Sequence, residues 1–313
     1  MRFYPSLAEI DLGNIPSVLT VGMFDGIHSG HLSVLNKVIE ISKQYNIPSI
    51  VLTFSNHPSS FFNSGATYSS LMTLEEKKEM MASLGIDILI AIPFDNYIAS
   101  LSAHAFANQI LVDLLHVSHI VFGYDNHFGQ NREGSKAFIE INFPSIQTHR
   151  VPETIIFNNV VSSSLIKQQL QIGNVENVTT LLHYPYQLSG EVIKGDQLGR
   201  TIGFPTANLK VDHVDKLIPA HGVYFTRIHL QGKIYYGMTN IGVRPTVTNS
   251  QELRIETHLL NFDADIYGEI LTVEFMNRLR DERKFDSFPE LINQLNIDRK
   301  DSLNLLAQIH ITT

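Results

Sequence analysis

The hydrophobic pattern changes along the chain and divides it into two parts. From residue 18 to about residue 173, short apolar runs alternate with segments whose apolar residues recur at helical spacing. Such alternation predicts a parallel sheet covered by helices on both faces, with ligands bound at the carboxyl ends of the strands. The expected strands are 18–24, 47–54, 86–94, 118–123 and 146–151.

Two helices between these strands have clear ends. Over residues 73–84, Thr73 and Glu76 have the spacing of a capping box, and Gly85 is expected to end the helix. A second helix is expected over residues 102–116. Its apolar face consists of Phe106, Ile110, Leu111 and Leu114.

The second part of the chain has the pattern of an antiparallel β domain. From 187 to 275 apolar residues recur with period two and turns are frequent. Segments 223–230 and 233–238, joined by Gln231 and Gly232, predict a hairpin. We therefore expect a small barrel.

A terminal helix is expected to follow that barrel over residues 288–309. Its predicted contacts with the barrel are Leu291, Leu295 and Leu305. Because the period changes near residues 183–186, we expect one domain over 1–182 and another over 183–313.

Composition narrows the class of protein. At 313 residues with 43% hydrophobic side chains, the chain has enough apolar material for two cores. The net charge of −8 argues against a nucleic-acid partner. No apolar run approaches the roughly 20 residues of a membrane span, and the N-terminus lacks the layout of a signal peptide. The chain is therefore expected to be cytoplasmic, with which the absence of cysteine agrees. Without cysteine, its chemistry must use histidine, carboxylate, hydroxyl and amide groups.

The segment VLTVGMFDGIHSGHL, residues 18–32, is a candidate phosphate site. It reads as a strand, a glycine-rich turn and a helix start that carries His28 and His31. Free backbone amides and the helix dipole favour an anion there, and small residues allow a ligand to approach closely. The glycines are Gly22, Gly26 and Gly30. A metal-binding histidine pair and surface histidines in a turn remain alternatives.

A second candidate is GDQLGRTIGFPTANL, residues 195–209. Glycine amides can reach phosphate, while the oxygens of Thr206 and Asn208 are hard neutral ligands suited to Mg²⁺. Arg200 lies among the glycines, which are Gly195, Gly199 and Gly203. The alternative is a glycine-rich turn in which Pro205 begins a strand.

Glu256 lies in a later strand and is a candidate general base if it faces a cleft. Arg254 and His258 share its face, and the other face carries Ile255, Thr257 and Leu259. A lone glutamate on a strand usually faces solvent, and by the same reasoning Arg280 and Arg283 read as surface charges.

Several motifs together resemble one family, the bifunctional bacterial riboflavin kinase and FAD synthetase (FMN adenylyltransferase). GMFDGIHSGH resembles its adenylyltransferase signature, and GRTIGFPTANL is similar to its kinase signature. The other matching segments, in the family order, are SNHPSSFF, LMTLEEKKEM, FGYDNHFGQNREG, GVYFT, TNIGVRPT, ETHLLNFDADIYG and RLRDERKF.

This resemblance implies an α/β Rossmann-like nucleotidyltransferase domain followed by an all-β, six-stranded riboflavin kinase barrel with a C-terminal helix. It also implies two reactions on small-molecule substrates. Riboflavin would be phosphorylated to FMN by the second domain, and FMN would be adenylylated to FAD with release of pyrophosphate by the first. ATP would be the co-substrate of both, with Mg²⁺ as cofactor; the sequence does not define an oligomeric state.

The resemblance also assigns roles to residues. Glu256 would be the base of the kinase, Thr206 and Asn208 would bind Mg²⁺, and His28 and His31 would act on the adenylyl transfer as hydrogen-bond donors. The implied ATP-binding residues are Gly22, Phe24, Asp25, Gly26, His28, Gly30, His31, Ser163, Ser164 and Lys167 in the first domain, and Gly195, Gly199, Arg200 and Gly203 in the second. The implied flavin-binding residues are His57, Pro58, Phe61, Asp125, Asn126, Phe128 and Arg280.

Several positions depart from the family pattern, among them the junction LLHYPY, where LGRPY is usual. Met23 stands where an asparagine is usual, Lys167 where an arginine is usual, and Asn126 where an aromatic residue is usual. A lysine lacks the planar fork with which arginine holds phosphate. This leaves a second interpretation, a riboflavin kinase whose N-terminal domain adenylylates weakly or only senses flavin or nucleotide.

Overall fold

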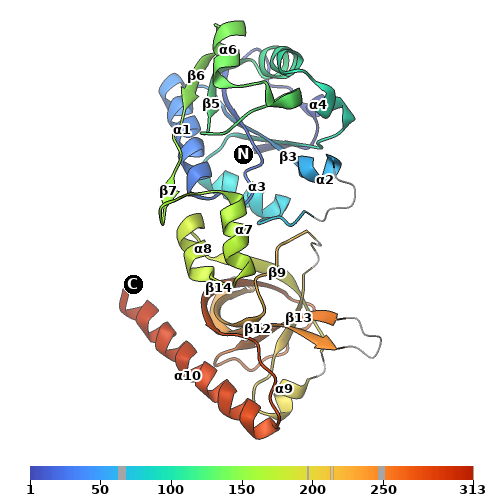
Figure 1. Cartoon of the computed structure of the whole chain (residues 1–313), viewed down its shortest axis with the longest axis vertical. Coiled ribbons are helices and arrows are strands. Elements are labelled where there is room, and N and C mark those ends of the chain that lie inside the picture. Colours follow the sequence, from blue (N-terminus) through green and yellow to red (C-terminus); the bar gives the residue numbers. More distant parts are fainter. Residues whose placement is uncertain (63–67, 196, 212, 214, 246–250, 313) are drawn as a thin grey trace. The chain divides into compact units, whose positions relative to one another are not determined.

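The computed structural model describes residues 1–62, 68–195, 197–211, 213, 215–245 and 251–312. It consists of two compact units, Met1–Ser163 and Ser164–Thr313 (Figure 1). Two positions within the predicted motifs, Asp196 and Thr246, lie outside the described residues.

The first unit is built on a parallel sheet with the strand order β1-β4-β3-β2-β5-β6. Each predicted strand is present, with both ends within three residues of the predicted bounds. The strands are β1 (Arg2–Tyr4), β2 (Ser17–Val21), β3 (Ser49–Phe54), β4 (Ile88–Ile92), β5 (Val117–Phe122) and β6 (Gln147–Arg150). A small hairpin follows, made of β7 (Ile155–Ile156) and β8 (Asn159–Val160).

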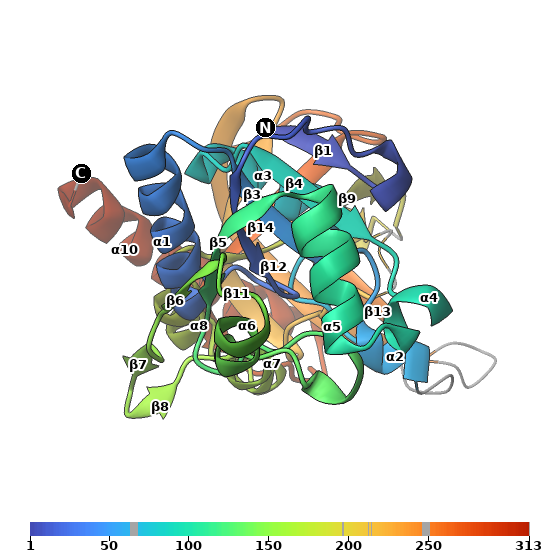
Figure 2. The ribbon, with the colours of Figure 1, turned by 90° about the horizontal axis from the view of Figure 1, so that it is seen from above.

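Alternating residues of the central strands enter two hydrophobic cores, one on each face of the sheet. Leu19, Ile50 and Ile90 pack with the residues of the helical stretch 103–114. Val51 and Leu89, their neighbours in sequence, pack against α1 (Ser29–Tyr45) and α3 (Leu74–Leu84). Figure 2 shows α1 and α5 on opposite sides of the strands. The predicted sheet with helices on both faces is therefore confirmed.

The predicted helix ends are confirmed for α3 and partly for the helix expected over 102–116. Thr73 and Glu76 form the complete capping box of α3, and Gly85 ends it with φ +90°. The second helix begins after the cap Ser102 but is α-helical only over α5 (Ala103–Phe106). It continues as a π-helix over Ala107–Leu114. The remaining helices of this unit are α2 (Pro58–Phe62), α4 (Asn96–Ser100) and α6 (Lys136–Asn142), with 3-10 turns at Leu7–Glu9 and Gln130–Arg132.

The second unit is a closed antiparallel barrel with the strand order β10-β13-β12-β11-β14-β9. The predicted hairpin is confirmed, because Leu230 of β11 pairs with Lys233 of β12 across Gln231 and Gly232. The strands are β9 (Tyr186–Ile193), β10 (Ala207–Lys210), β11 (Gly222–Leu230), β12 (Lys233–Pro245), β13 (Gln251–Leu259) and β14 (Ile270–Arg280). The helices are α7 (Ser163–Gln171), α8 (Val175–Leu182), α9 (Leu198–Thr201) and α10 (Phe288–Thr312).

The two units meet in sequence at residues 163 and 164, before the expected change at 182. The boundary lies this early because α7, α8 and the residues between them form hydrogen bonds with the barrel. The backbone N–H of Ala220 donates to the carbonyl of Leu170, and the Arg278 guanidinium donates to the carbonyl of Ile172. Glu176 of α8 accepts from the backbone N–H of Arg278. Helix α8 and most of α7 thus pack as part of the barrel unit.

Candidate functional site

The first candidate site lies where the strand order of the parallel sheet reverses. Strand β2 lies between β3 and β5, and the chain leaves β2 toward β3 but leaves β5 toward β6. Ligands of such sheets bind at the carboxyl ends of these two strands. The loop 22–28 follows β2 and the loop 123–129 follows β5. The Asn126 side chain donates from Nδ2 to the carbonyl of Val21 over 2.9 Å, which joins the two loops.

The loop after β2 has an unusual backbone. Phe24 and Ile27 have φ values of +49° and +38°, in the left-handed region, while their side chains are fully buried. Gly26 has φ +84°, which an L side chain rarely adopts. A Cβ added at Gly30 would lie 3.3 Å from the His28 ring. Burial of the two apolar side chains holds this strained backbone in place.

His28 and His31 form a stacked pair at the start of α1. His28 is the N-cap, and its Nδ1 accepts from the backbone N–H of His31 over 3.3 Å. The two ring centroids are 3.7 Å apart, and Phe24 packs on His31 at 5.1 Å. Since the lone pairs of an imidazole lie in its ring plane, two stacked rings do not converge on one ion. Among the described residues, no group of three or more histidines and carboxylates is placed to hold a metal.

Both imidazoles are held in the neutral form. Burial lowers the pKa of His28 to about 4, and it holds the pKa of His31 well below its usual range. Because Nδ1 of His28 is an acceptor, its remaining N–H is on Nε2. Nδ1 of His31 is enclosed and has no hydrogen-bond partner within the described part of the chain. The pair therefore offers uncharged donors beside a helix N-terminus, an arrangement suited to phosphate.

Asp25 connects this loop to the segment that precedes α3. Its carboxylate accepts from Tyr68 Oη and Ser70 Oγ, each over 2.9 Å, and from the backbone N–H of Leu71 over 2.8 Å. Burial and the neighbouring Asp25 carboxylate raise the pKa of Tyr68. The Asp25 carboxylate is thus engaged by protein donors and sets the shape of the loop.

The predicted ATP-binding serines and Lys167 lie on α7. Ser163 Oγ donates to the backbone carbonyl of Asp25 over 2.8 Å. It therefore contacts the loop 22–28, which is called the phosphate loop below. Ser164 and Lys167 belong to the second unit.

The predicted flavin-binding residues of the first unit follow β3 and β5. His57 stacks on Tyr68 with 3.6 Å between ring centroids. Pro58 begins α2, and Phe61 packs edge-on against Phe94. Asp125 is exposed, Asn126 joins the two loops as described, and the Phe128 ring is buried against Phe106 and Phe122. Phe128 therefore anchors the loop in the core.

Two cavities lie among the described residues of the barrel unit. The larger, of about 500 Å³, is lined on one side by Arg200, Pro205, Thr206 and Ala207. Its other side is the segment after β13, residues 262–267. The smaller, of about 320 Å³, is mainly apolar. It is lined by Gln197, Leu198, Gly199, Ile202, Phe204, Thr206, Val223, Met238, Asn240, Glu256, His258, Arg280, Glu282, Arg283, Phe285, Phe288, Leu291 and Leu295.

Thr206 borders both cavities, and Glu256 lies in the wall of the smaller one. The predicted faces of β13 are confirmed, since Ile255, Thr257 and Leu259 are buried while Glu256 is half-buried. Asn208 of β10 and Asn240 of β12 are the cross-strand partners of Glu256. Paired residues of antiparallel strands share a face, so two amides flank the carboxylate.

The glycines of the segment 195–203 make room for this group. A Cβ added at Gly195 would lie 2.3 Å from the Asn208 amide, and one at Gly199 would lie 2.2 Å from the Phe204 carbonyl. Gly199 and Arg200 lie on α9, and Gly203 follows it. Residues 198–201 therefore form a short helix followed by a turn, close to Thr206 and strand β10.

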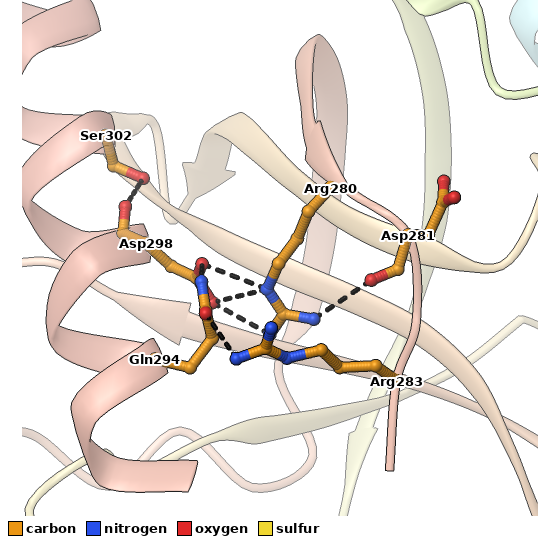
Figure 3. Close-up of polar contacts among 6 residues, drawn as sticks. All are labelled: Arg280, Asp281, Arg283, Gln294, Asp298 and Ser302. Carbon is orange, nitrogen blue, oxygen red and sulfur yellow. Dashed lines mark hydrogen bonds and ion pairs between the residues drawn. The ribbon is translucent and has the colours of Figure 1, made fainter. Parts of the chain in front are cut away.

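Arg280 and Arg283, at the rim of the smaller cavity, bind helix α10 (Figure 3). The Arg280 guanidinium donates to both oxygens of Asp298 over 2.8 to 3.1 Å, and Arg283 donates to Gln294. Asp298 is 2% exposed. Of the predicted helix contacts, Leu291 and Leu295 line the cavity.

Three residues at these sites were not predicted from sequence. His258 donates from Nδ1 to the Pro205 carbonyl over 2.8 Å and so positions the residue before Thr206. Tyr68 and Lys77 lie beside Asp25. The position of His258 in the ETH motif, two residues after Glu256, is the sequence feature that could have identified it. Nothing in the local pattern marks Tyr68, which is separated from Asp25 by more than 40 residues.

Comparison with known proteins gives two family matches that cover most of the chain. Residues 12–165 match the FAD synthetase family and residues 182–306 match the riboflavin kinase family. The match over the first domain does not favour a purely sensing role for it. No helix among the described residues is long and apolar enough to cross a membrane.

Curated relatives match over nearly the full length. Bifunctional riboflavin kinase/FMN adenylyltransferase from Listeria monocytogenes is 36% identical, over 95% of this chain and 94% of the relative. The protein of that description from Escherichia coli K12 is 36% identical, over 90% of each. A solved structure described as a macrolide-efflux protein from Streptococcus pneumoniae is 30% identical with a TM-score of 0.89, over 96% of this chain and 98% of that one.

Proposed function

Because the chain belongs to the family of bifunctional riboflavin kinase/FMN adenylyltransferases, we propose that it performs both reactions of that name. The barrel unit phosphorylates riboflavin to FMN with ATP. The first unit adenylylates FMN to FAD with a second ATP and releases pyrophosphate. Since both reactions consume ATP and the chain lacks cysteine, we expect it to work in the cytoplasm.

The observation that carries the kinase assignment is the shared wall of the two barrel cavities. The smaller cavity is mostly apolar and suits the flat riboflavin ring, while the larger one carries Arg200 and suits the ATP phosphates. Thr206 borders both and marks the place of phosphoryl transfer. Glu256 in the flavin cavity is the base that takes the proton from the riboflavin hydroxyl.

The residues around Thr206 fit Mg²⁺. Thr206 and Asn208 provide neutral oxygens, and Glu256, which pairs with Asn208, provides a carboxylate nearby. Magnesium in kinases is usually held by few protein oxygens together with the nucleotide phosphates, which agrees with this sparse donor set. When bound, the ion offsets negative charge on the transferring phosphate. Thr206 and Asn208 orient the phosphates toward Glu256.

Adenylyl transfer makes different demands on the first unit. The FMN phosphate is already an anion at neutral pH, so the attack on the α-phosphate requires no base. The site must bring two anions together and stabilise the departing pyrophosphate. Neutral His28 and His31 donate hydrogen bonds at the start of α1. The loops after β3 and β5 are placed to receive the flavin.

A crossed pair of variants tests both assignments. With riboflavin, ATP and Mg²⁺, chromatography of the wild-type reaction should show FMN and then FAD. Glu256→Gln should abolish FMN formation but still convert added FMN to FAD, because the base serves only the first reaction. His31→Ala should form FMN normally and lower FAD formation about a hundredfold.

The matched controls are the two variants themselves, each assayed for the reaction of the other unit. Loss of both reactions in the Glu256→Gln variant would contradict the separation of roles. A wild-type protein that accumulates FMN and makes no FAD would refute the second activity.

A further inference from the structure

Lys77 of α3 is a buried lysine next to the phosphate loop. Its side chain is 6% exposed, although lysine is almost never fully buried unless its charge is compensated. It lies on α3, the helix capped by Thr73. The proposed mechanisms of kinase and adenylyl transfer assign it no role. Such a residue needs a physical explanation.

The ammonium of Lys77 holds the first turn of the loop. Nζ donates to the Met23 carbonyl over 2.7 Å and to Thr53 Oγ1 over 3.4 Å. Thr53 Oγ1 in turn donates to the same carbonyl over 3.1 Å. Met23 directly precedes Phe24, where the backbone enters its left-handed conformation. Lys77 therefore fixes the point at which the chain turns out of β2.

Lys77 is also a positive charge that acts on the histidine pair. The charge of Asp25, in the same loop, raises the pKa of Lys77, while burial lowers it to about 8. The charge of Lys77 in turn lowers the pKa of His31, as does His28. With both imidazoles neutral, the charges facing one another here are the Asp25 carboxylate and the Lys77 ammonium.

This balance matters because the expected ligand is a polyphosphate. Without Lys77, the negative charge of the Asp25 carboxylate would lack this offset within a loop that has to bind ATP. With it, the charges of Asp25 and Lys77 offset one another, and the positive charge of Lys77 also acts on His31. In a buried site of low dielectric, such a charge acts strongly on a nearby anion.

We propose that Lys77 is a positioning residue for adenylyl transfer, which holds the Met23 carbonyl and balances Asp25 so that the phosphate loop accepts ATP. The proposal rests on the proposed function of the first unit. It goes further by adding a residue on α3, outside the signature loop, whose charge state governs that loop.

The test combines a variant with a pH profile. Lys77→Met keeps the length of the side chain and removes the charge. It should lower kcat/KM for ATP in FAD formation at least about tenfold and leave FMN formation unchanged. In the wild-type protein, kcat/KM for FAD formation should fall as the pH rises through about 8, when Lys77 loses its proton. The variant should lack this alkaline decline, which a merely structural role would not produce.

Lys78→Met is the matched control, because Lys78 is the next residue of α3 and contacts the Phe3 ring. It should retain both activities and the alkaline decline. If Lys77→Met does not fold, the pH dependence of kcat/KM for FAD formation in the wild-type protein still tests the proposal. A constant kcat/KM between pH 7 and about 9.5 would overturn the proposal. Normal FAD formation by a folded Lys77→Met protein would also overturn it, and a wild-type protein that makes no FAD would refute the proposed function as well.

Discussion

Under the proposed function, His28 is a residue that serves both folding and binding. As N-cap it accepts from the backbone of His31, and for this its Nδ1 must be unprotonated. The same requirement leaves the N–H on Nε2. Protonation would remove the cap and place a charge in a buried stack. The cap and the proposed phosphate contact therefore require the same neutral tautomer.

The pH dependence of stability should reveal this residue. Burial lowers the pKa of His28 from 6.5 to about 4, so the unfolded chain takes up a proton before the folded chain does. Stability from His28 is thus fully present above pH 6.5 and is lost as the pH falls toward 4. The loss should reach about 3 kcal/mol. The contribution of His28 is the difference in free energy of unfolding between the wild type and His28→Asn, measured with urea. The asparagine retains a capping oxygen.

The expected difference between these two proteins shrinks steadily from pH 7 to about pH 4. A difference that stays constant over this range would contradict a neutral, buried His28. Titrating groups that do not interact with His28 are common to both proteins and cancel, whereas His31 and Asp25 interact with His28 and contribute to the measured difference.

For single residues, the sequence predicted those whose contacts lie within a few positions along the chain. His28 and His31 stand at a helix start, and Thr73 and Glu76 form their capping box within one turn. Lys77 and Tyr68 could not be assigned, because their roles depend on contacts with residues more than 40 positions away. Arg280 was read as a surface charge from the residues alone, yet its partner Asp298 is buried.

At the scale of elements, a buried polar contact ties α10 to the end of β14. The Arg280 guanidinium holds the buried Asp298 from the end of β14, and Gln294 also donates to Asp298. Breaking a buried ion pair by removing one partner is costly, because the other charge is left without compensation.

Asp298→Asn should therefore lower the free energy of unfolding by about 3 kcal/mol, measured by urea denaturation. Asp301→Asn removes the same charge from an exposed position of the same helix and should change it by less than about 0.5 kcal/mol. Equal effects of the two variants would show that the Arg280 contact does not anchor α10.

Secondary structure was predictable wherever the period was strong. The parallel strands, the hairpin and α10 follow the hydrophobic pattern. The π-helix at Ala107–Leu114 was not foreseen, since its buried residues Ile110 and Leu111 lie on the face that an α-helix would also bury. Sequence spacing does not distinguish the two.

The whole molecule is two units, and their boundary has a measurable consequence. Residues 164–313, with most of α7 and all of α8, should fold alone and phosphorylate riboflavin. Residues 183–313 lose the Leu170 and Glu176 bonds to the barrel and the buried apolar residues of α8. Their free energy of unfolding should be lower by more than about 3 kcal/mol.

Chemical denaturation of the two fragments, followed by circular dichroism, makes this comparison. Equal stabilities would place the boundary at residue 182, as the change of period first indicated. The change of period marks where the barrel strands begin, but not which helices pack on them.

The position of Thr206 between the two barrel cavities has a consequence for inhibitor design. Under the proposed assignment, one side of this residue receives a flavin and the other a nucleotide. A single molecule that joins an isoalloxazine ring to an adenosine polyphosphate would occupy both cavities at once. Because such a compound loses its translational freedom only once, it should bind more tightly than either half alone.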